Sequence, residues 1–331
     1  MLPLNYKLRW NSTDNFSLTI LKYKIFRRDE LNCKLDKGFF RIRMNQLTEH
    51  QRGLLAVLLT AVLWSSGGLF VKLISLSAMQ ISFFRCLIAA FVFLVIFRKQ
   101  ALYFNGFALI NSLFYAIVLI TFVIATKTTT AANAIFLQST APIYVLIFEP
   151  ILFRTRYERI NIITIVVCFT GMILFFTGEL SPGHLEGNLI ALIAGIAFAA
   201  LFLGLRKNKN EYQIASIFYG NIFVALVCIP YITNLEHISL SDLWMVTFLG
   251  VFQIGVAYAI FSYGLRRVFA IEASMISLME PVLNPVWVFI GYGEKPSVMA
   301  IAGGIIIIGA IAMRMLIIEM RNRRIKKSPA V

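Results

Sequence analysis

Four polar residues recur at spacings of three, three and four in a long apolar stretch, residues 270–291. They are Ser274, Ser277, Glu280 and Asn284. A helix of this length can cross a membrane, and the spacing places all four side chains on one of its faces. A carboxylate among hydroxyl and amide groups can bind a protonated amine, or it can take up and release a proton. The stripe therefore indicates a substrate-binding or coupling role for Glu280.

Pro281 directly follows this carboxylate. Proline removes one helical hydrogen bond, so a carbonyl one turn back, near Ser277, becomes available as an acceptor. Such a cluster of donors and acceptors suits an amine-bearing or zwitterionic solute. The alternative is structural: the stripe holds a neighbouring helix, and the proline only kinks the span.

Few other ionisable residues lie inside apolar stretches, where charge is costly. Arg85 can bind the carboxylate of a solute or form a structural salt bridge. Glu149 is a second coupling candidate, although its side chain can instead snorkel to the membrane interface. Glu272 lies near the end of the stretch that holds Glu280, where solvation accounts for its charge.

Uncharged side chains complete the set of candidates for a substrate cavity. Trp64 can stack on a solute, although aromatic residues in membranes more often pack or lie at interfaces. The other uncharged candidates are Gln138, Gln253, Tyr258 and Tyr263. Metal sites are not expected, because the cysteines are isolated and His50, His184 and His237 fall in polar segments.

The composition indicates what kind of fold positions these residues. Of the 331 residues, 59% are hydrophobic and only 14% are charged, against roughly 45–50% and about 25% in soluble domains. A soluble protein of this length cannot bury so much apolar surface. We therefore expect an all-α integral membrane protein with a lipid bilayer around it. A nucleic-acid partner is not expected, because no basic folded surface is apparent.

Ten apolar runs are long enough to span a bilayer as helices. Their approximate ranges are 54–74, 78–97, 106–125, 131–153, 160–177, 187–205, 214–232, 243–263, 270–291 and 297–318. Within the sixth run, Ala191, Gly195 and Ala199 recur every four residues, a spacing typical of close helix packing.

The distribution of lysine and arginine predicts the orientation of these spans, because cytoplasmic loops are enriched in both residues. With the N-terminus inside, the internal loops hold ten basic residues and the external loops hold three. Both termini are then cytoplasmic, and the basic C-terminal tail, residues 320–331, lies inside as well. We expect a multi-pass protein of the cytoplasmic (inner cell) membrane.

The N-terminal segment, residues 1–52, is of a different kind. It carries eleven basic and five acidic residues and no sustained apolar run, and it shows no cleavable signal pattern. One interpretation is a basic cytoplasmic segment. The other, which we favour, is that translation starts at Met44 and that residues 1–43 are dispensable.

The sequence also contains a degenerate internal repeat with an offset of 139 residues. This offset aligns Pro142 with Pro281, Ala134 with Ala273, and Gln138 with Ser277. Each half holds five spans, and an odd number places the two halves in opposite orientations. The prediction is two inverted five-helix repeats, residues 53–178 and 187–319, an arrangement typical of transporters.

Several motifs in this order resemble the drug/metabolite transporter superfamily, EamA type, over about residues 53–319. They are Leu63-Trp64-Ser65-Ser66, Phe70-Val71-Lys72, Phe84-Arg85, Ile88-Ala89-Ala90, Tyr258 to Tyr263, Leu265-Arg266-Arg267, Glu280-Pro281 and Gly293-Glu294. The resemblance implies a secondary transporter with a central cavity between the halves. It also favours the structural role for Arg85.

The function that we expect is transport of a small metabolite by alternating access. A proton or a counter-substrate is the expected coupling partner, and export is one of the two directions considered. Amino acids, amines, nucleosides and drug-like solutes are all compatible substrates. A polytopic membrane transferase is the main rival, but no aspartate lies deep within a span and no histidine lies in one. A channel is the second rival, and it would need a filter ring or a gating element. No cofactor is expected.

Overall fold

The computed structural model describes residues 47–129, 131–156, 158–177, 184–208, 210–232, 238–292 and 297–327. The chain divides into residues 1–48 and a second unit, residues 49–331, and the helices discussed below all belong to the second unit. The alternative start at Met44, the dispensable segment 1–43 and the loop motif Gly293-Glu294 lie outside the described residues.

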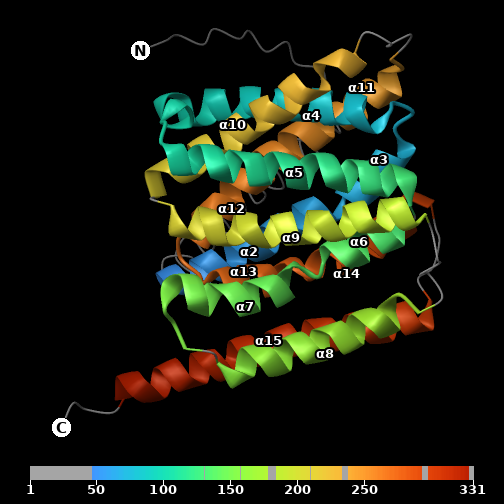
Figure 1. Ribbon diagram of the computed structural model, residues 1–331. Coiled ribbons are helices and arrows are strands. Elements are labelled where there is room, and N and C mark those ends of the chain that lie inside the picture. Colours follow the sequence, from blue (N-terminus) through green and yellow to red (C-terminus); the bar gives the residue numbers. More distant parts are fainter. Residues whose placement is uncertain are drawn as a thin grey trace, which may run out of the picture. The chain divides into compact units, whose positions relative to one another are not determined.

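Every regular element in the described residues is helical (Figure 1). The helices of residues 49–175 are α2 (Glu49–Ser65), α3 (Gly67–Leu73), α4 (Ala78–Phe97), η1 (Arg98–Leu102), α5 (Gly106–Thr128), α6 (Ala131–Gln138), α7 (Ala141–Phe153) and α8 (Arg159–Phe175). Those that follow are α9 (Leu185–Lys207), α10 (Asn210–Cys228), η2 (Ile229–Tyr231), α11 (Leu240–Phe248), η3 (Leu249–Val256), α12 (Ala257–Leu265), α13 (Ala270–Ser277), α14 (Met279–Tyr292) and α15 (Val298–Lys327).

Eight helical stretches in the described residues are long and apolar enough to cross a membrane. A helix satisfies its backbone hydrogen bonds internally, as a segment in hydrocarbon must. The class predicted from composition, an all-helical membrane protein, is confirmed. Two further predicted spans differ: α8 is an apolar helix of only 17 residues, and the run 270–291 is divided between α13 and α14. The count of ten stays a prediction.

Three of the apolar runs are interrupted near their middle. The first breaks at Ser66 between α2 and α3, and the fourth breaks at residues 139–140 between α6 and α7. The ninth breaks at Leu278 between α13 and α14. The last residues before the second and third breaks, Gln138 and Ser277, are the pair that the 139-residue offset aligns. A proline follows each of these two breaks. Proline has no backbone N–H, and it is tolerated in the first turn of a helix because the N–H groups there have no partner within the helix.

The predicted eighth span is continuous but contains a π-helix, η3, between α11 and α12. Two glycines place this wide segment directly against α4. A Cβ on Gly250 would lie 2.9 Å from the carbonyl oxygen of Arg85, and one on Gly255 would lie 2.9 Å from the side chain of Val92. The π-helix therefore approaches α4 at the level of Arg85.

Close helix crossings hold the interrupted spans in place. Helix α2 packs against α12, α13 and α14, while α9 packs against α5, α6 and α7 (Figure 1). The prediction of close packing at Ala191, Gly195 and Ala199 is confirmed, since Ala191 and Ala199 are buried. A Cβ on Gly195 would lie 2.8 Å from the carbonyl oxygen of Leu137, so only glycine lets α9 approach the break that follows α6.

Candidate functional site

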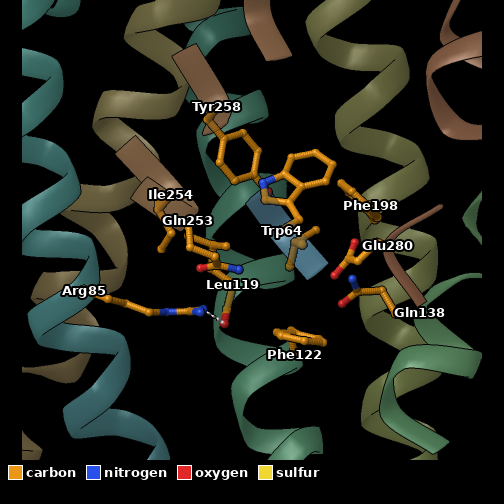
Figure 2. Close-up of a pocket in the computed structure, with 11 residues that line it drawn as sticks. Trp64, Arg85, Leu119, Phe122, Gln138, Phe198, Gln253, Ile254, Tyr258 and Glu280 are labelled. Carbon is orange, nitrogen blue, oxygen red and sulfur yellow. Dashed lines mark hydrogen bonds between the residues drawn. The ribbon is translucent and has the colours of Figure 1, made fainter. Parts of the chain in front are cut away.

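A cavity inside residues 49–331 is lined by residues from seven of the ten predicted apolar runs (Figure 2). The space free of atoms amounts to ≈ 350 Å³, including the part open to the surroundings. The lining residues are Trp64, Arg85, Val118, Leu119, Phe122, Gln138, Phe198, Gln253, Ile254, Tyr258 and Glu280. Six of the eight predicted substrate-site residues are among them: Trp64, Arg85, Gln138, Gln253, Tyr258 and Glu280.

Ser277 and Asn284, the other two predicted residues, do not line this cavity. The hydroxyl of Ser277 donates to the carbonyl oxygen of Ser274 at 2.6 Å, inside its own helix. Asn284 packs against Gly68, on which a Cβ would lie 3.4 Å from the amide nitrogen of Asn284. The break at Leu278 shifts the helical phase, so the stripe read from the sequence does not continue as one face.

Arg85 is fully buried in α4 and reaches the cavity with its guanidinium. Its Nη2 atom donates to the carbonyl oxygen of Leu119 at 2.8 Å. Its Nε and Nη1 atoms have no hydrogen-bond partner among the described residues, and no acidic residue there pairs with it. The structural salt bridge considered for Arg85 is thus not formed in the described part of the chain. The guanidinium keeps donors for a further acceptor.

Glu280 lies in the first turn of α14, immediately after the break. Figure 2 shows its carboxylate and the amide of Gln138 on one side of the cavity, and the guanidinium of Arg85 on the other. Within the described residues the carboxylate forms no hydrogen bond or ion pair. The fourth and the ninth apolar runs, each interrupted beside this point, therefore contribute an amide and a carboxylate to the cavity.

Buried polar atoms without partners are concentrated around the cavity. Besides the two arginine nitrogens, they include Nε1 of Trp64, Oε1 of Gln138 and Oε1 of Gln253. Each buried and unpaired polar atom costs roughly 1–3 kcal/mol. Such a concentration is typical of a site whose hydrogen bonds are completed by water or by a bound solute.

Aromatic rings form the apolar wall of the cavity. The ring of Trp64 lies 5.0 Å from that of Tyr258 and 5.5 Å from that of Phe198, measured between centroids. Tyr115 packs behind Tyr258 at 4.8 Å. Trp64 is therefore held by edge and tilted contacts, as the packing alternative expects, while its indole N–H remains without a partner.

Glu149 is buried and does not reach an interface. Its two carboxylate oxygens accept hydrogen bonds from the backbone N–H groups of Ala270 and Ile271, both at 2.8 Å. These groups begin α13, where the helix dipole also favours a negative charge. The snorkelling alternative is wrong, because the carboxylate of α7 caps a helix of the other half.

The solvation expected for Glu272 is also wrong, because its side chain is only 3% exposed. Its carboxylate contacts Nε2 of His50 at 2.9 Å and Nη1 of Arg314 at 3.4 Å. Arg314 also donates from Nε to Oδ1 of Asn161 at 2.9 Å. This network joins α2, α8, α13 and α15. The sequence signal that could have found it is a single arginine inside the predicted span 297–318.

A second set of polar contacts lies at the opposite end of the α2–α3 stretch. Asp242 accepts from the backbone N–H of Ser75 at 2.9 Å and from its hydroxyl at 2.6 Å. Lys127 donates to the carbonyl oxygen of Ile74 at 2.8 Å, and Lys72 donates to that of Thr129 at 3.3 Å. Polar networks thus lie at both ends of the α2–α3 stretch.

No cluster of three or more metal-ligating side chains occurs in the described residues. The side chains that line the cavity are hydrogen-bonding, charged and apolar ones.

The sequence matches the EamA-like transporter family over residues 51–177 and again over 185–316. It is 23% identical over 259 residues to a protein named as an uncharacterized transporter of Archaeoglobus fulgidus, a match covering 77% of this chain and 93% of that one. It is 25% identical to human solute carrier family 35 member G1, over 78% and 77% of the two chains. It is 24% identical to the pseudopaline exporter of Pseudomonas aeruginosa, over 78% and 94%.

A protein of known crystal structure has the same fold, with a TM-score of 0.68 over 79% of this chain and 96% of that chain. The two sequences are 17% identical.

Proposed function

Because the chain belongs to the EamA-like transporter family of the drug/metabolite transporter superfamily, we propose that it carries a small amine-bearing or zwitterionic metabolite across the cell membrane as a secondary active transporter. The transport cycle is alternating access around the central cavity. The bundle consists of ten spans in two inverted five-helix repeats, and both termini are cytoplasmic.

The positions of the helix breaks support the inverted repeat. The family matches this chain twice in succession, and the breaks after Gln138 and Ser277 lie 139 residues apart. Interrupted spans at corresponding positions of two halves are the arrangement from which many transporters build their substrate site. The count of basic residues in the loops supports the orientation.

The observation that carries the proposal is the pair of opposite charges at one cavity, neither of which has an ionic partner among the described residues. Arg85 presents two unpaired nitrogens to an acceptor such as a carboxylate, and Glu280 presents a carboxylate to an amine. Burying such charges without partners is costly, so their retention favours a ligand that completes both. Trp64, Phe122 and Phe198 add an apolar wall for the body of the solute.

The two polar networks support alternating access. The Glu272–His50–Arg314 network and the Glu149 cap of α13 close the end that the loop charges place in the cytoplasm. The Asp242–Ser75 contacts close the external end. Opening either end requires the contacts there to separate, so each network serves as a gate.

Two carboxylates are candidates for coupling. We propose that Glu280 couples transport, either by carrying a proton or as the counter-charge of the substrate. We assign Glu149 a positioning role, because its oxygens already bind the start of α13. The match to a transporter family favours a carrier over a transferase. The polar contacts at both ends of the bundle favour a gated carrier over an open channel.

Counterflow into proteoliposomes tests this proposal. Proteoliposomes that contain the purified protein are loaded with one unlabelled amino acid, amine or nucleoside at a time. Uptake of a trace of the same solute, labelled and added outside, is then followed without an ion gradient. We expect saturable counterflow with at least one zwitterionic solute that has an apolar side chain. Its N-acetyl and methyl ester derivatives, which each lack one charge, should compete poorly.

Two results would contradict the proposal. Flux that does not saturate and shows no counterflow would indicate a channel. Equal competition by the zwitterion and by both singly charged derivatives would show that the two charges of the cavity do not select the solute.

A further inference from the structure

A second hollow lies apart from the central cavity, on the side of α9 that faces away from it. It is a groove between α5, α7 and α9, and Figure 1 shows α9 between the other two helices. The space free of atoms is ≈ 770 Å³, including the open part. Its lining residues, none of which lines the central cavity, are Phe107, Ile110, Asn111, Phe114, Tyr144, Phe148, Leu152, Ile196, Ala199, Ala200, Leu203, Gly204 and Lys207.

The groove is apolar along most of its length and open at its side. Ile110, Phe148 and Ile196 line it and are 51%, 48% and 48% exposed. Residues 196–207 of α9 run along the groove, a distance of about 16 Å at 1.5 Å per residue. The hydrocarbon of one membrane leaflet is about 15 Å deep. The groove therefore has the length of one acyl chain in one leaflet.

Two polar groups mark one end of this groove. Lys207, in the last turn of α9, is exposed and lines its end. Asn111 is 1% exposed, lines the groove, and has an amide nitrogen, Nδ2, without a hydrogen-bond partner in the described part of the chain. Gly204 makes room for this amide, because a Cβ there would collide with it.

The order of these groups matches the head of a phospholipid. Asn111 contacts α9 at Gly204, three residues before Lys207, which is a rise of about 4.5 Å along the helix. In a phospholipid the ester carbonyl lies below the phosphate by a similar step, and the acyl chain follows. Arg154, which ends α7 two residues after the groove residue Leu152, adds a second cation near this end.

We infer that the groove binds one acyl chain of an anionic phospholipid, with the phosphate at Lys207 and the ester carbonyl accepting from the Asn111 amide. Under the orientation proposed above, the lipid belongs to the cytoplasmic leaflet. A basic residue near an anionic membrane surface strengthens such binding by about fivefold. Because α7 follows the break at residues 139–140, the lipid contacts a half-helix that the transport cycle must move.

Photo-crosslinking in vesicles tests this site. The full-length protein is reconstituted in phosphatidylcholine vesicles that contain a trace of phosphatidylglycerol with a diazirine in its acyl chain. A phosphatidylcholine probe with the same acyl chain serves as the reference. We expect the anionic probe to label α5, α7 and α9 at groove residues, and the reference probe to label them about fivefold less.

Two pairs of variants make the test specific. Lys207→Ala should lower labelling by the anionic probe to the level of the reference probe, while Lys99→Ala, which removes an exposed lysine from η1, should not. Ala200→Trp should fill the groove and abolish labelling, while Ile193→Trp, on the exposed face of α9 outside the groove, should not. Labelling that survives Ala200→Trp, or equal labelling by both probes, would overturn the inference.

Discussion

Two carboxylates inside the bundle, the buried Glu149 and the half-buried Glu280, differ sharply in what surrounds them. Glu149 lies in α7 of the first half, and both of its oxygens accept backbone N–H groups at the start of α13. Glu280 lies in the first turn of α14, in the second half, and lines the central cavity. Its carboxylate has no partner in the described residues. Each carboxylate is followed by a proline, in Glu149-Pro150 and Glu280-Pro281, so the sequence context does not separate them.

The contrast between Glu149 and Glu280 suggests a way to separate a structural charge from a functional one in a membrane protein. A buried charge must be compensated, and the protein itself compensates Glu149. For Glu280 we propose that a proton or a cationic group of the solute supplies the compensation. The same reasoning separates Arg314, paired with Glu272, from Arg85, which has no ionic partner in the described region.

The largest effect is expected at Arg85. Arg85→Ala should raise the apparent KM for a zwitterionic substrate on the order of 30-fold or more, because losing one partner of a buried charge pair costs about 2–5 kcal/mol. Added guanidinium should restore part of the uptake. Arg267→Ala, which removes a partly exposed arginine paired with the exposed Glu49, is the control. An unchanged KM for Arg85→Ala, measured in proteoliposomes, would break the comparison.

Glu149→Ala should reduce stability by about 3 kcal/mol, because two backbone N–H groups at the start of α13 are left buried and unpaired. The unfolding midpoint in detergent, followed by tryptophan fluorescence, measures the change. Glu158→Ala removes an exposed ion pair with Arg321 and should cost less than about 1 kcal/mol. Equal losses of stability in the two variants would show that the hydrogen bonds from Glu149 to the start of α13 contribute no more than an exposed ion pair.

Gly195→Val tests the first helix break. The new Cβ would lie 2.8 Å from the carbonyl oxygen of Leu137, and overpacking of this kind costs roughly 1–3 kcal/mol. Gly309→Val is the matched control, since nothing lies within 4 Å of a Cβ at that position. A comparable loss of stability in both variants would mean that the change in helix propensity causes it, and that the contact between α9 and the break after α6 does not.

The smallest effect is expected at His50. Glu272 keeps Arg314 and the backbone N–H of Phe269 when His50→Ala removes one of its partners. The imidazole is 33% exposed, so the loss should be roughly 1 kcal/mol or less in the same unfolding assay. A loss as large as that of Glu149→Ala would show that the charge of Glu272 is compensated by a single contact.

Composition and periodicity were sufficient to predict the class and most of the cavity. An apolar run must become a helix in a bilayer, so the ranges of the spans follow closely from the sequence. Six of the predicted residues line the cavity. Their position could be predicted because a polar side chain is costly against lipid, so a polar residue in an apolar run usually faces the interior. The repeat offset aligns Pro142 with Pro281, and the structure places a helix break just before each of them, although the offset itself predicts no break.

Three other features could not be predicted, because each depends on how distant segments pack or on where a helix breaks. The N–H groups that bind Glu149 are more than 120 residues distant, and nothing in their own sequence marks them. The stripe from Ser274 to Asn284 assumed one continuous helix, and the break at Leu278 ended that phase. The buried ion pair of Glu272 depended on a helix packing that periodicity does not specify.

Transport by the Glu280→Gln variant shows whether the carboxylate of Glu280 takes part in the transport cycle. The substitution preserves side-chain volume but removes the charge of a carboxylate that no described residue compensates. The unfolding midpoint is expected to stay at the wild-type value. A proton carrier loses gradient-driven uptake and retains substrate exchange, whereas a substrate counter-charge weakens both modes through a raised KM. Normal transport in both modes, or a variant that no longer folds, would contradict the account.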